Sequence, residues 1–392
     1  MNTQSTPVHI RLWHHDFWRM AIANLLLTMA VYLFVPVLPD WLLHVQGLSY
    51  QDTGLAMGAF GAGLFLFGCF TCFLVEHFRR NMACVWAVIL MIASMGILLY
   101  MNSQQTTFTG VTMIFVQRLL LGASYGVAQM ILSSTLIIDT CESFQRTEAN
   151  HSAAWFSRFA LSLGPMAGIL LVRYSDFRSV TLLAMGLSLL SIVLILLVHF
   201  PFRAPREDVP IVSLDRFLML QSWPLFVNLL LITLIVGLLM STCLSELFYA
   251  MVMTGFLLAL LAQRFVFRDA ELKSEVVSGL VLIGAALLMM LTRSQAIVEF
   301  ASPLFVGFGL GIIGSRFLLF FIKLSRHCQR GTSQSTFMLA WESGVALGIG
   351  LGYGVLEGNV SWVMQMSLVF TVAALLMYNF YTHNWFLHHK NR

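Results

Sequence analysis

Five charged residues lie inside long apolar stretches of the chain: Arg118, Arg158, Arg264, Arg316 and Glu342. A charged side chain at the centre of a bilayer helix costs about 2.5 to 3.5 kcal/mol on insertion scales, so it tends to face a partner or a wet cavity. Proton exchange and ion pairing are the chemistry open to such groups. Arg264 and Arg158 lie near the ends of their stretches, within reach of the interface, whereas Arg118 lies deeper.

Glu342 admits two interpretations. Its depth matches that of Arg316 in the preceding stretch, and consecutive antiparallel helices are usually neighbours, so the two side chains could form a structural ion pair. Alternatively, Glu342 lines the interface between two halves of the molecule and exchanges a proton as a central cavity alternates between the two sides of a membrane. The sequence leaves both interpretations open.

The composition is that of a membrane protein, because 58% of the residues are hydrophobic, 10% are charged and the mean hydropathy is +0.83. A helical crossing needs about 20 apolar residues. The runs that we expect to span the membrane are 20–43, 51–75, 83–101, 110–138, 155–172, 179–199, 224–243, 247–266, 275–292, 301–322, 335–356 and 361–382. The predicted fold is therefore an all-α membrane protein with twelve transmembrane helices.

An internal repeat divides the chain. Residues 154–168 and 340–354 are identical at seven of fifteen positions and lie 186 residues apart in a chain of 392. This spacing is typical of a duplicated membrane protein with two homologous halves. We expect a six-helix bundle over residues 1–199, a cytoplasmic linker over 200–223 and a second six-helix bundle over 224–392. Residues 213–222 of the linker are expected to form an amphipathic surface helix.

The basic residues predict the orientation. With both termini in the cytoplasm, fifteen Lys and Arg residues near the ends of the runs lie inside, against Arg173, Arg178 and Arg293 outside. This asymmetry is the one that cytoplasmic loops show. We expect a multi-pass protein of the cytoplasmic (inner) membrane. Its net charge of +4 is then explained by basic residues that face anionic lipid headgroups, and not by binding of nucleic acid.

Short motifs carry a family resemblance. Residues 74–81 read Leu-Val-Glu-His-Phe-Arg-Arg-Asn, and residues 261–265 repeat part of this pattern as Leu-Ala-Gln-Arg-Phe. Further motifs are Arg118-Leu-Leu-Leu-Gly122-Ala-Ser-Tyr-Gly126 and Gly164-Pro165-Met-Ala-Gly168. Together they resemble the major facilitator superfamily over nearly the whole chain, although Cys72, Glu76, His77 and Arg79 depart from the family's first loop motif.

The resemblance implies two pseudo-symmetric six-helix bundles and secondary transport by alternating access. It also implies a cytoplasmic gate, for which the candidates are Glu76, Arg79, Arg80, Asp139, Glu142, Gln263 and Arg264. Candidates for proton coupling or translocation are Arg118, Glu342, Arg316 and Arg158. In this superfamily Gly164, Pro165 and Gly168 resemble the antiporter signature of proton-coupled exporters, although glycine and proline also serve plain helix packing.

The family's cavity helices correspond to spans 1, 4, 7 and 10. Their candidate cavity residues are Asn24, Tyr32, Gln117, Tyr125, Gln129, Asn228 and Thr233. Amides, aromatic rings and one arginine suit a small amphipathic molecule that is neutral or anionic. We expect no cofactor and no metal, and a monomer.

Two other functions share parts of this pattern. A proton-coupled importer of a nutrient or metabolite would have the same fold, and only the direction of flux distinguishes it. A polytopic membrane enzyme would need a cluster of histidines or carboxylates at a membrane face, and no convincing cluster of that kind is found in the sequence.

Overall fold

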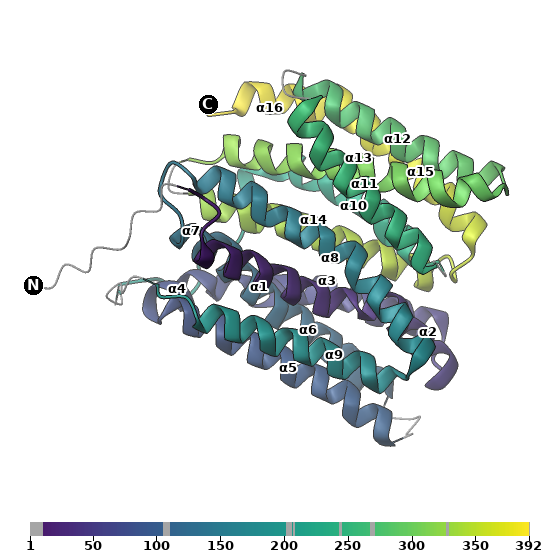
Figure 1. The fold of residues 1–392 in the computed structure, drawn as a ribbon, viewed down its shortest axis with the longest axis horizontal. Helices are drawn as coiled ribbons and strands as arrows, with labels where there is room; N and C mark the ends of the chain where they lie inside the picture. The colour runs from purple at the N-terminus through teal and green to yellow at the C-terminus, as the bar shows by residue number, and fades with distance from the viewer. Residues whose placement is uncertain are drawn as a thin grey trace, which may run out of the picture.

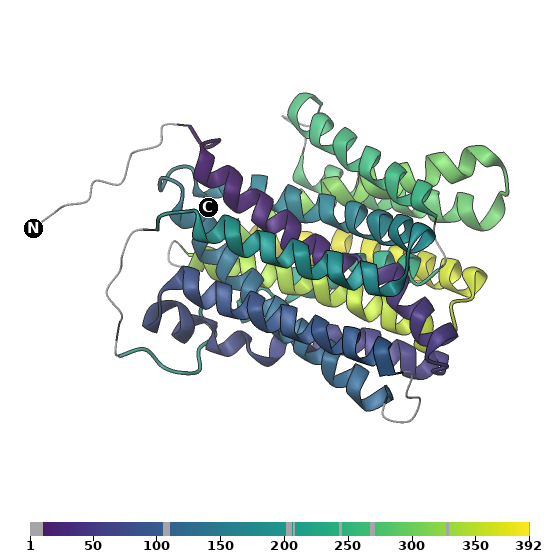
Figure 2. The same ribbon diagram turned by 60° about the horizontal axis from the view of Figure 1, so that its bottom comes forward.

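The computed structural model describes residues 11–104, 110–200, 206, 208–242, 245–266, 271–326 and 329–391. These residues form a bundle of long helices (Figure 1). Both views place the start of α1 and the end of α16 at the same end of the bundle (Figures 1 and 2). Residues 201–205 and 207 of the predicted linker lie outside the described residues.

We use "first half" for the helices up to Leu196 and "second half" for those from Trp223 onward. The first half contains α1 (His15–Tyr32), α2 (Phe34–Asp40), η1 (Trp41–Val45), α3 (Tyr50–Leu66), η2 (Gly68–Phe70), α4 (Thr71–His77), α5 (Arg80–Gln104), α6 (Gly110–Ile131), η3 (Leu132–Leu136), α7 (Ile137–Asp139), α8 (Arg146–Tyr174) and α9 (Phe177–Leu196). The second half contains η4 (Leu220–Ser222), α10 (Trp223–Met240), α11 (Glu246–Phe265), α12 (Leu272–Thr292), α13 (Ala296–Leu324), α14 (Arg330–Gly354), α15 (Val360–Met377), η6 (Tyr378–Thr382) and α16 (His383–His389).

Each predicted apolar run overlaps a helix or a stack of helices, and residue 243, the end of the seventh run, lies outside the described residues. Within the described residues, eleven helices or helix stacks are long and apolar enough to cross a membrane, by length and composition. The largest boundary error concerns the fifth run, expected to start at residue 155, because α8 begins at Arg146. Its first turns are polar, and Asn150 faces an internal cavity there, so hydropathy missed them.

Helix α14 is also long, but among the described residues it is not one of these eleven because its composition is too polar. Its 25 residues are mostly buried, including Thr332, Ser333, Gln334 and Glu342. It packs on α10 within the second half and on α3 of the first half, so it lies between the two halves. Its polar residues therefore face other helices rather than lipid.

The two halves meet at both ends of the bundle. At one end, which we call the Gly54 end, Gly54 of α3 lies against Gly350 and Gly354 of α14 so closely that a methyl group on Gly54 would overlap their backbone. Between another pair of helices from the two halves, Arg173 at the end of α8 donates a hydrogen bond of 2.8 Å to Glu246 at the start of α11. At the opposite end, described residues of the linker are hydrogen-bonded to both halves.

The linker does not form the predicted amphipathic helix over 213–222. Arg216 has a left-handed backbone (φ +59°), and only Leu220–Ser222 form a short helical turn. Phe217 is buried against Gly68, where α3 breaks, and the Met219 amide donates to Thr336 of α14. The segment fails to form a surface helix because two of its apolar side chains, Phe217 and Met219, are buried among the helices instead of lying along a membrane surface.

Candidate functional site

Glu342 is held by tyrosines from the other half of the molecule. Its side chain is 5% exposed on α14, and its two carboxylate oxygens accept hydrogen bonds from Tyr32 of α1 (3.0 Å) and Tyr125 of α6 (3.4 Å). Tyr32 and Tyr125 lie 310 and 217 residues before Glu342 in the chain. The carboxyl group thus bridges the two halves, and any movement that parts them removes its hydrogen-bond donors.

The tyrosines belong to a buried polar network in the first half. Gln129 donates to Thr28 (2.7 Å) and to the Tyr125 hydroxyl (3.4 Å), so Thr28 and Gln129 position Tyr125. One helical turn away, Asn24 donates to Ser157 of α8 (2.8 Å). The network ties α1, α6 and α8 together beside Glu342.

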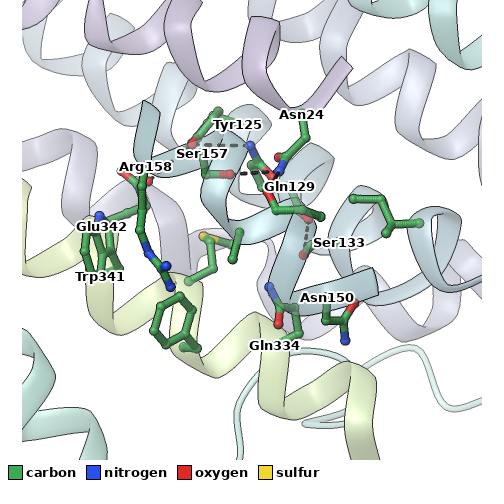
Figure 3. Close-up of a pocket in the computed structure, with 15 residues that line it drawn as sticks. Asn24, Tyr125, Gln129, Ser133, Asn150, Ser157, Arg158, Gln334, Trp341 and Glu342 are labelled. Carbon is green, nitrogen blue, oxygen red and sulfur yellow. Dashed lines mark hydrogen bonds between the residues drawn. The ribbon is translucent and has the colours of Figure 1, made fainter. Parts of the chain in front are cut away.

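A cavity of about 40 Å³ lies beside this network. It is lined from α1, α6, α8 and α14 by residues that include Asn24, Gln129, Ser157, Arg158, Gln334 and Glu342 (Figure 3). A buried water needs roughly 10 to 15 Å³ measured in this way, so the cavity has room for a few water molecules. The two halves are in contact at both ends of the bundle, on either side of this cavity.

Arg158 faces the cavity with its guanidinium buried. The side chain is 2% exposed, lies 4.7 Å from the ring centre of Trp155 and 5.9 Å from that of Trp341, and donates to Ser315 (2.7 Å). Its Nε and Nη2 atoms have no hydrogen-bond partner among the described residues. Gly314 of α13 makes room for the guanidinium, since a methyl group there would lie 2.9 Å from the Arg158 Nε atom.

The interpretation in which Arg316 forms an ion pair with Glu342 is wrong. Arg316 of α13 instead pairs with the buried carboxylate of Glu275 on α12. Helices α12 and α13 pack along their length, and this contact places Arg316 against Glu275. Glu342 thereby remains available to the tyrosines of the first half.

Several predicted cavity residues lie away from this cavity. Asn228 of α10 donates to the Ala374 carbonyl of α15 (3.1 Å), and Thr233 donates to carbonyls of α10 and to Ala340 of α14 (3.4 Å). Both therefore hold helices of the second half together. Gln117 is buried in α6, but it is not among the residues that line the cavity.

Arg118 is also outside the cavity lining. Its side chain is 3% exposed, and the guanidinium lies 5.1 Å from the ring centre of Phe60 on α3. The Nε and Nη1 atoms have no hydrogen-bond partner within the described part of the chain. Arg118 is thus buried among the helices, with an aromatic contact that can stabilise the cation.

The glycines of the Gly164-Pro165-Met-Ala-Gly168 motif bring α8 against the first helix. A methyl group on Gly164 would lie 2.7 Å from Cβ of Tyr32, and Gly168 faces the Leu33 carbonyl, where α1 gives way to α2. Pro165 lies inside α8 without ending it. The motif therefore packs directly behind Tyr32, one of the two partners of Glu342.

At the end opposite Gly54, the two halves are joined by the Arg216 cluster, which comprises Glu76, Arg80, Asp139, Asp215, Arg216 and Thr332. The Arg216 guanidinium donates to Glu76 (2.6 Å) and to Thr135 (2.9 Å) in the first half. Its backbone amide donates to Thr332 of α14 (2.9 Å), whose hydroxyl donates to Asp215 (2.7 Å).

Glu76, Arg80 and Asp139 come together as the loop motif suggested. Arg80 pairs with Asp139 and lies 3.9 Å from Glu76. Sequence reasoning missed Asp215, Arg216 and Thr332, although the polar Asp-Arg pair inside an otherwise apolar linker segment was a usable signal.

The other gate candidates lie apart from this cluster. Arg79 lines an apolar groove formed with Phe67, Phe78 and Trp86, while the Glu142 carbonyl accepts from the Gln145 amide in a turn before α8. Gln263 and Arg264 lie in the last turn of α11, where the Arg264 guanidinium is 5.8 Å from the ring centre of Phe265. Among the described residues, neither Gln263 nor Arg264 is hydrogen-bonded or ion-paired to the Arg216 cluster.

We expect Arg216→Gln to shift the protein toward a state that is open at the Arg216 end. The ion pair is partly exposed, so its loss should cost about 1 kcal/mol, which is about a fivefold change in population. Ser134 lies under Gly331 at this closure. A Ser134→Cys reporter in a background without the native cysteines should therefore react about five times faster with an impermeant maleimide.

Arg19→Gln provides the control. Arg19 pairs with Asp16 inside α1, so the same change of charge leaves the contact between the halves intact. An equal labelling rate in the Arg216→Gln and Arg19→Gln backgrounds would contradict the role of Arg216.

Comparison with known proteins identifies the type of fold. Residues 20–349 match the family model of the Major Facilitator Superfamily. No curated protein sequence matches the chain. Among solved structures, the human organic anion transporter MFSD10 has a TM-score of 0.68 at 15% identity, covering 93% of this chain and 98% of that one.

Two further structures are similar to the same extent. A bacterial homologue of the iron transporter ferroportin, in its outward-facing state, has a TM-score of 0.67 at 15% identity over 95% of this chain and 99% of that one. The nucleoside transporter NupG has a TM-score of 0.65 at 12% identity over 93% and 99%. At these identities the likeness concerns the fold.

Proposed function

The chain belongs to the Major Facilitator Superfamily, and from that premise we propose that it is a secondary active transporter that moves a small amphipathic molecule by alternating access, coupled to protons. We propose export by antiport as the direction, with an importer as the competing possibility. The similar structures are named as transporters of quite different substrates, so they favour transport over catalysis without favouring one substrate.

The observation that carries the proposal is the contact of Glu342 with Tyr32 and Tyr125 across the two halves. With the halves in contact, the carboxyl group is buried and accepts hydrogen bonds from two hydroxyl donors. When the halves part, those donors leave and water enters. Because a charge in a dry environment is costly unless it is paired, the preferred protonation of Glu342 changes with the conformation, which is what proton coupling requires.

Support for export comes from the Gly164-Pro165-Met-Ala-Gly168 motif. It resembles the exporter signature, and its glycines allow α8 to pack behind Tyr32. Movement of α8 against α1 would therefore displace a partner of Glu342. This gives the motif a physical route to the coupling site beyond simple packing.

We propose that the chain crosses the membrane twelve times, with both termini in the cytoplasm. We also propose that it is a monomer in the cytoplasmic (inner) membrane. Helix α14, eleventh in chain order, completes the twelve spans in this proposal. Its polar composition is compatible with a spanning position because α3 and α10 cover it and its side chains are buried. The Arg216 cluster is then the cytoplasmic gate, and the Gly54 end faces outward.

The test is the direction of substrate movement in proteoliposomes under an imposed pH gradient. Candidate substrates are first found by their effect on the melting temperature of the purified protein. An acidic interior should drive uptake by an antiporter, whereas an acidic exterior should drive uptake by a symporter, whichever way the protein is inserted. Uptake under acid-inside conditions supports export by antiport.

Uptake only under acid-outside conditions would replace the exporter with an importer. Flux that is indifferent to both gradients would contradict proton coupling itself. Liposomes without protein, and a protonophore that collapses the gradient, provide the controls.

A further inference from the structure

The guanidinium of Arg158 is a buried cation without a buried anion beside it. Its contacts are Ser315 and the rings of Trp155 and Trp341, and among the described residues no carboxylate oxygen forms an ion pair with it within 4.0 Å. Glu342 lines the same cavity, but its oxygens are bonded to the two tyrosines. A buried charge is costly unless it is paired and hydrogen-bonded, so this side chain is suited to a partner that the chain does not supply.

Side-chain oxygens of Asn24, Asn150 and Gln334 in the cavity lining lack partners among the described residues, but the unpartnered atoms of Arg158 and Trp155 are donors. Nε and Nη2 of Arg158 and the indole Nε1 of Trp155 are buried N–H groups without a hydrogen-bond partner within the described part of the chain. A guanidinium presents two parallel N–H groups that match the two oxygens of a carboxylate. Arg158 lines the cavity and Trp155 does not, so it is the two unsatisfied donors of the guanidinium that favour an acceptor with two oxygens.

The surroundings of this group also suit an apolar body. Phe337, Met338 and Trp341 line the cavity together with Ala153 and Ala154 (Figure 3). Trp155 and Trp341 lie within about 6 Å of the cation and hold it in place by cation–π attraction. The cavity as it stands has room for a carboxylate group, and a larger body would enter when the halves part.

We propose that Arg158 binds the anionic group of the transported molecule, and that the substrate class is an organic anion with an aromatic or otherwise apolar body. This inference rests on the proposed transport function. It adds the chemical class of the substrate and the residue that selects it. Arg158 acts as a substrate-binding residue, while Glu342 acts on the proton.

The experiment measures binding rather than transport, so its failure can be distinguished from a failure of proton-coupled transport. Three aromatic carboxylates, benzoate, 2-naphthoate and indole-3-acetate, are each compared with the matching amide by calorimetric titration of the purified full chain. In the natural protein we expect at least one carboxylate to bind about tenfold more tightly than its amide, as a charged hydrogen bond gives.

Variants assign that preference to one residue. Arg158→Gln should bind the carboxylate and the amide with about equal affinity, and Arg158→Lys, which keeps the charge but loses the planar pair of donors, should show an intermediate preference. Arg178→Gln, an exposed arginine on α9, is the control and should keep the full preference.

If Arg158→Gln does not fold, Arg158→Lys alone decides the question. Binding of carboxylates no tighter than of amides by the natural protein would overturn the proposal, as would no binding of any carboxylate. A carboxylate preference in Arg158→Lys and any folded Arg158→Gln protein equal to that of the natural protein would overturn it too. In each case proton-coupled flux of a neutral molecule would remain possible.

Discussion

Replacement of Glu342 by glutamine is expected to abolish substrate flux driven by a pH gradient while leaving the protein folded. Glutamine has the same shape, and its carbonyl oxygen can still accept the Tyr32 hydrogen bond, so the packing between α14 and the first half is kept. It cannot take up or release a proton. We therefore expect gradient-driven flux in proteoliposomes to fall to the level of protein-free liposomes.

Two measurements separate this loss from a general defect. Exchange of substrate between equal concentrations on both sides, which needs binding and conformational change but no gradient, should continue in Glu342→Gln. Glu299→Gln changes an exposed carboxylate at the start of α13 and should transport normally. Undiminished gradient-driven flux in Glu342→Gln would remove Glu342 from the coupling mechanism.

Gly54→Val is expected to slow transport by hindering closure at the Gly54 end. A side chain at this position would overlap the backbone of α14 around Gly350 and Gly354. Such overpacking costs about 1 to 3 kcal/mol, which lowers the population of the closed state by about 5- to 150-fold. Because the contact joins the two halves, each half should still fold, and the initial rate of substrate exchange should fall by a similar factor.

The chain offers two glycine controls for this variant. A methyl group on Gly58 would meet Gly350 at 3.9 Å, an ordinary contact, and one on Gly96 would meet nothing within 4 Å among the described residues. Gly58→Ala and Gly96→Val should therefore exchange substrate at close to the natural rate. A natural exchange rate in Gly54→Val would show that closure at this end is not needed for transport.

Hydropathy and the internal repeat were sufficient to predict an all-helical membrane chain, because these signals are local or depend only on spacing. A bilayer crossing requires a certain length of apolar residues whatever its neighbours are. The predictions were weakest where polar residues face the protein interior. The polar start of α8 and the polar composition of α14 show this, since hydropathy cannot distinguish a residue facing a cavity from one facing water.

The charged residues illustrate the same limit. Their presence inside apolar runs was sufficient to select Arg158, Arg316 and Glu342 as candidates, because the cost of a charge in a bilayer depends on depth alone to a first approximation. Their partners could not be predicted. Arg316 forms an ion pair with Glu275 on α12, and Glu342 accepts hydrogen bonds from tyrosines of the other half.

The sequence by itself indicated that the chain lies in a membrane and that its two halves resemble each other, and it selected the charged residues worth testing. Only the tertiary structure decided which of them meet, as the bridge from Tyr32 to Glu342 and the insertion of Arg216 between the halves demonstrate. The physical reason is that a partner depends on the rotation of each helix about its axis and on which helix lies beside it. Both are set by packing between segments hundreds of residues apart, on which the local pattern of residues carries little information.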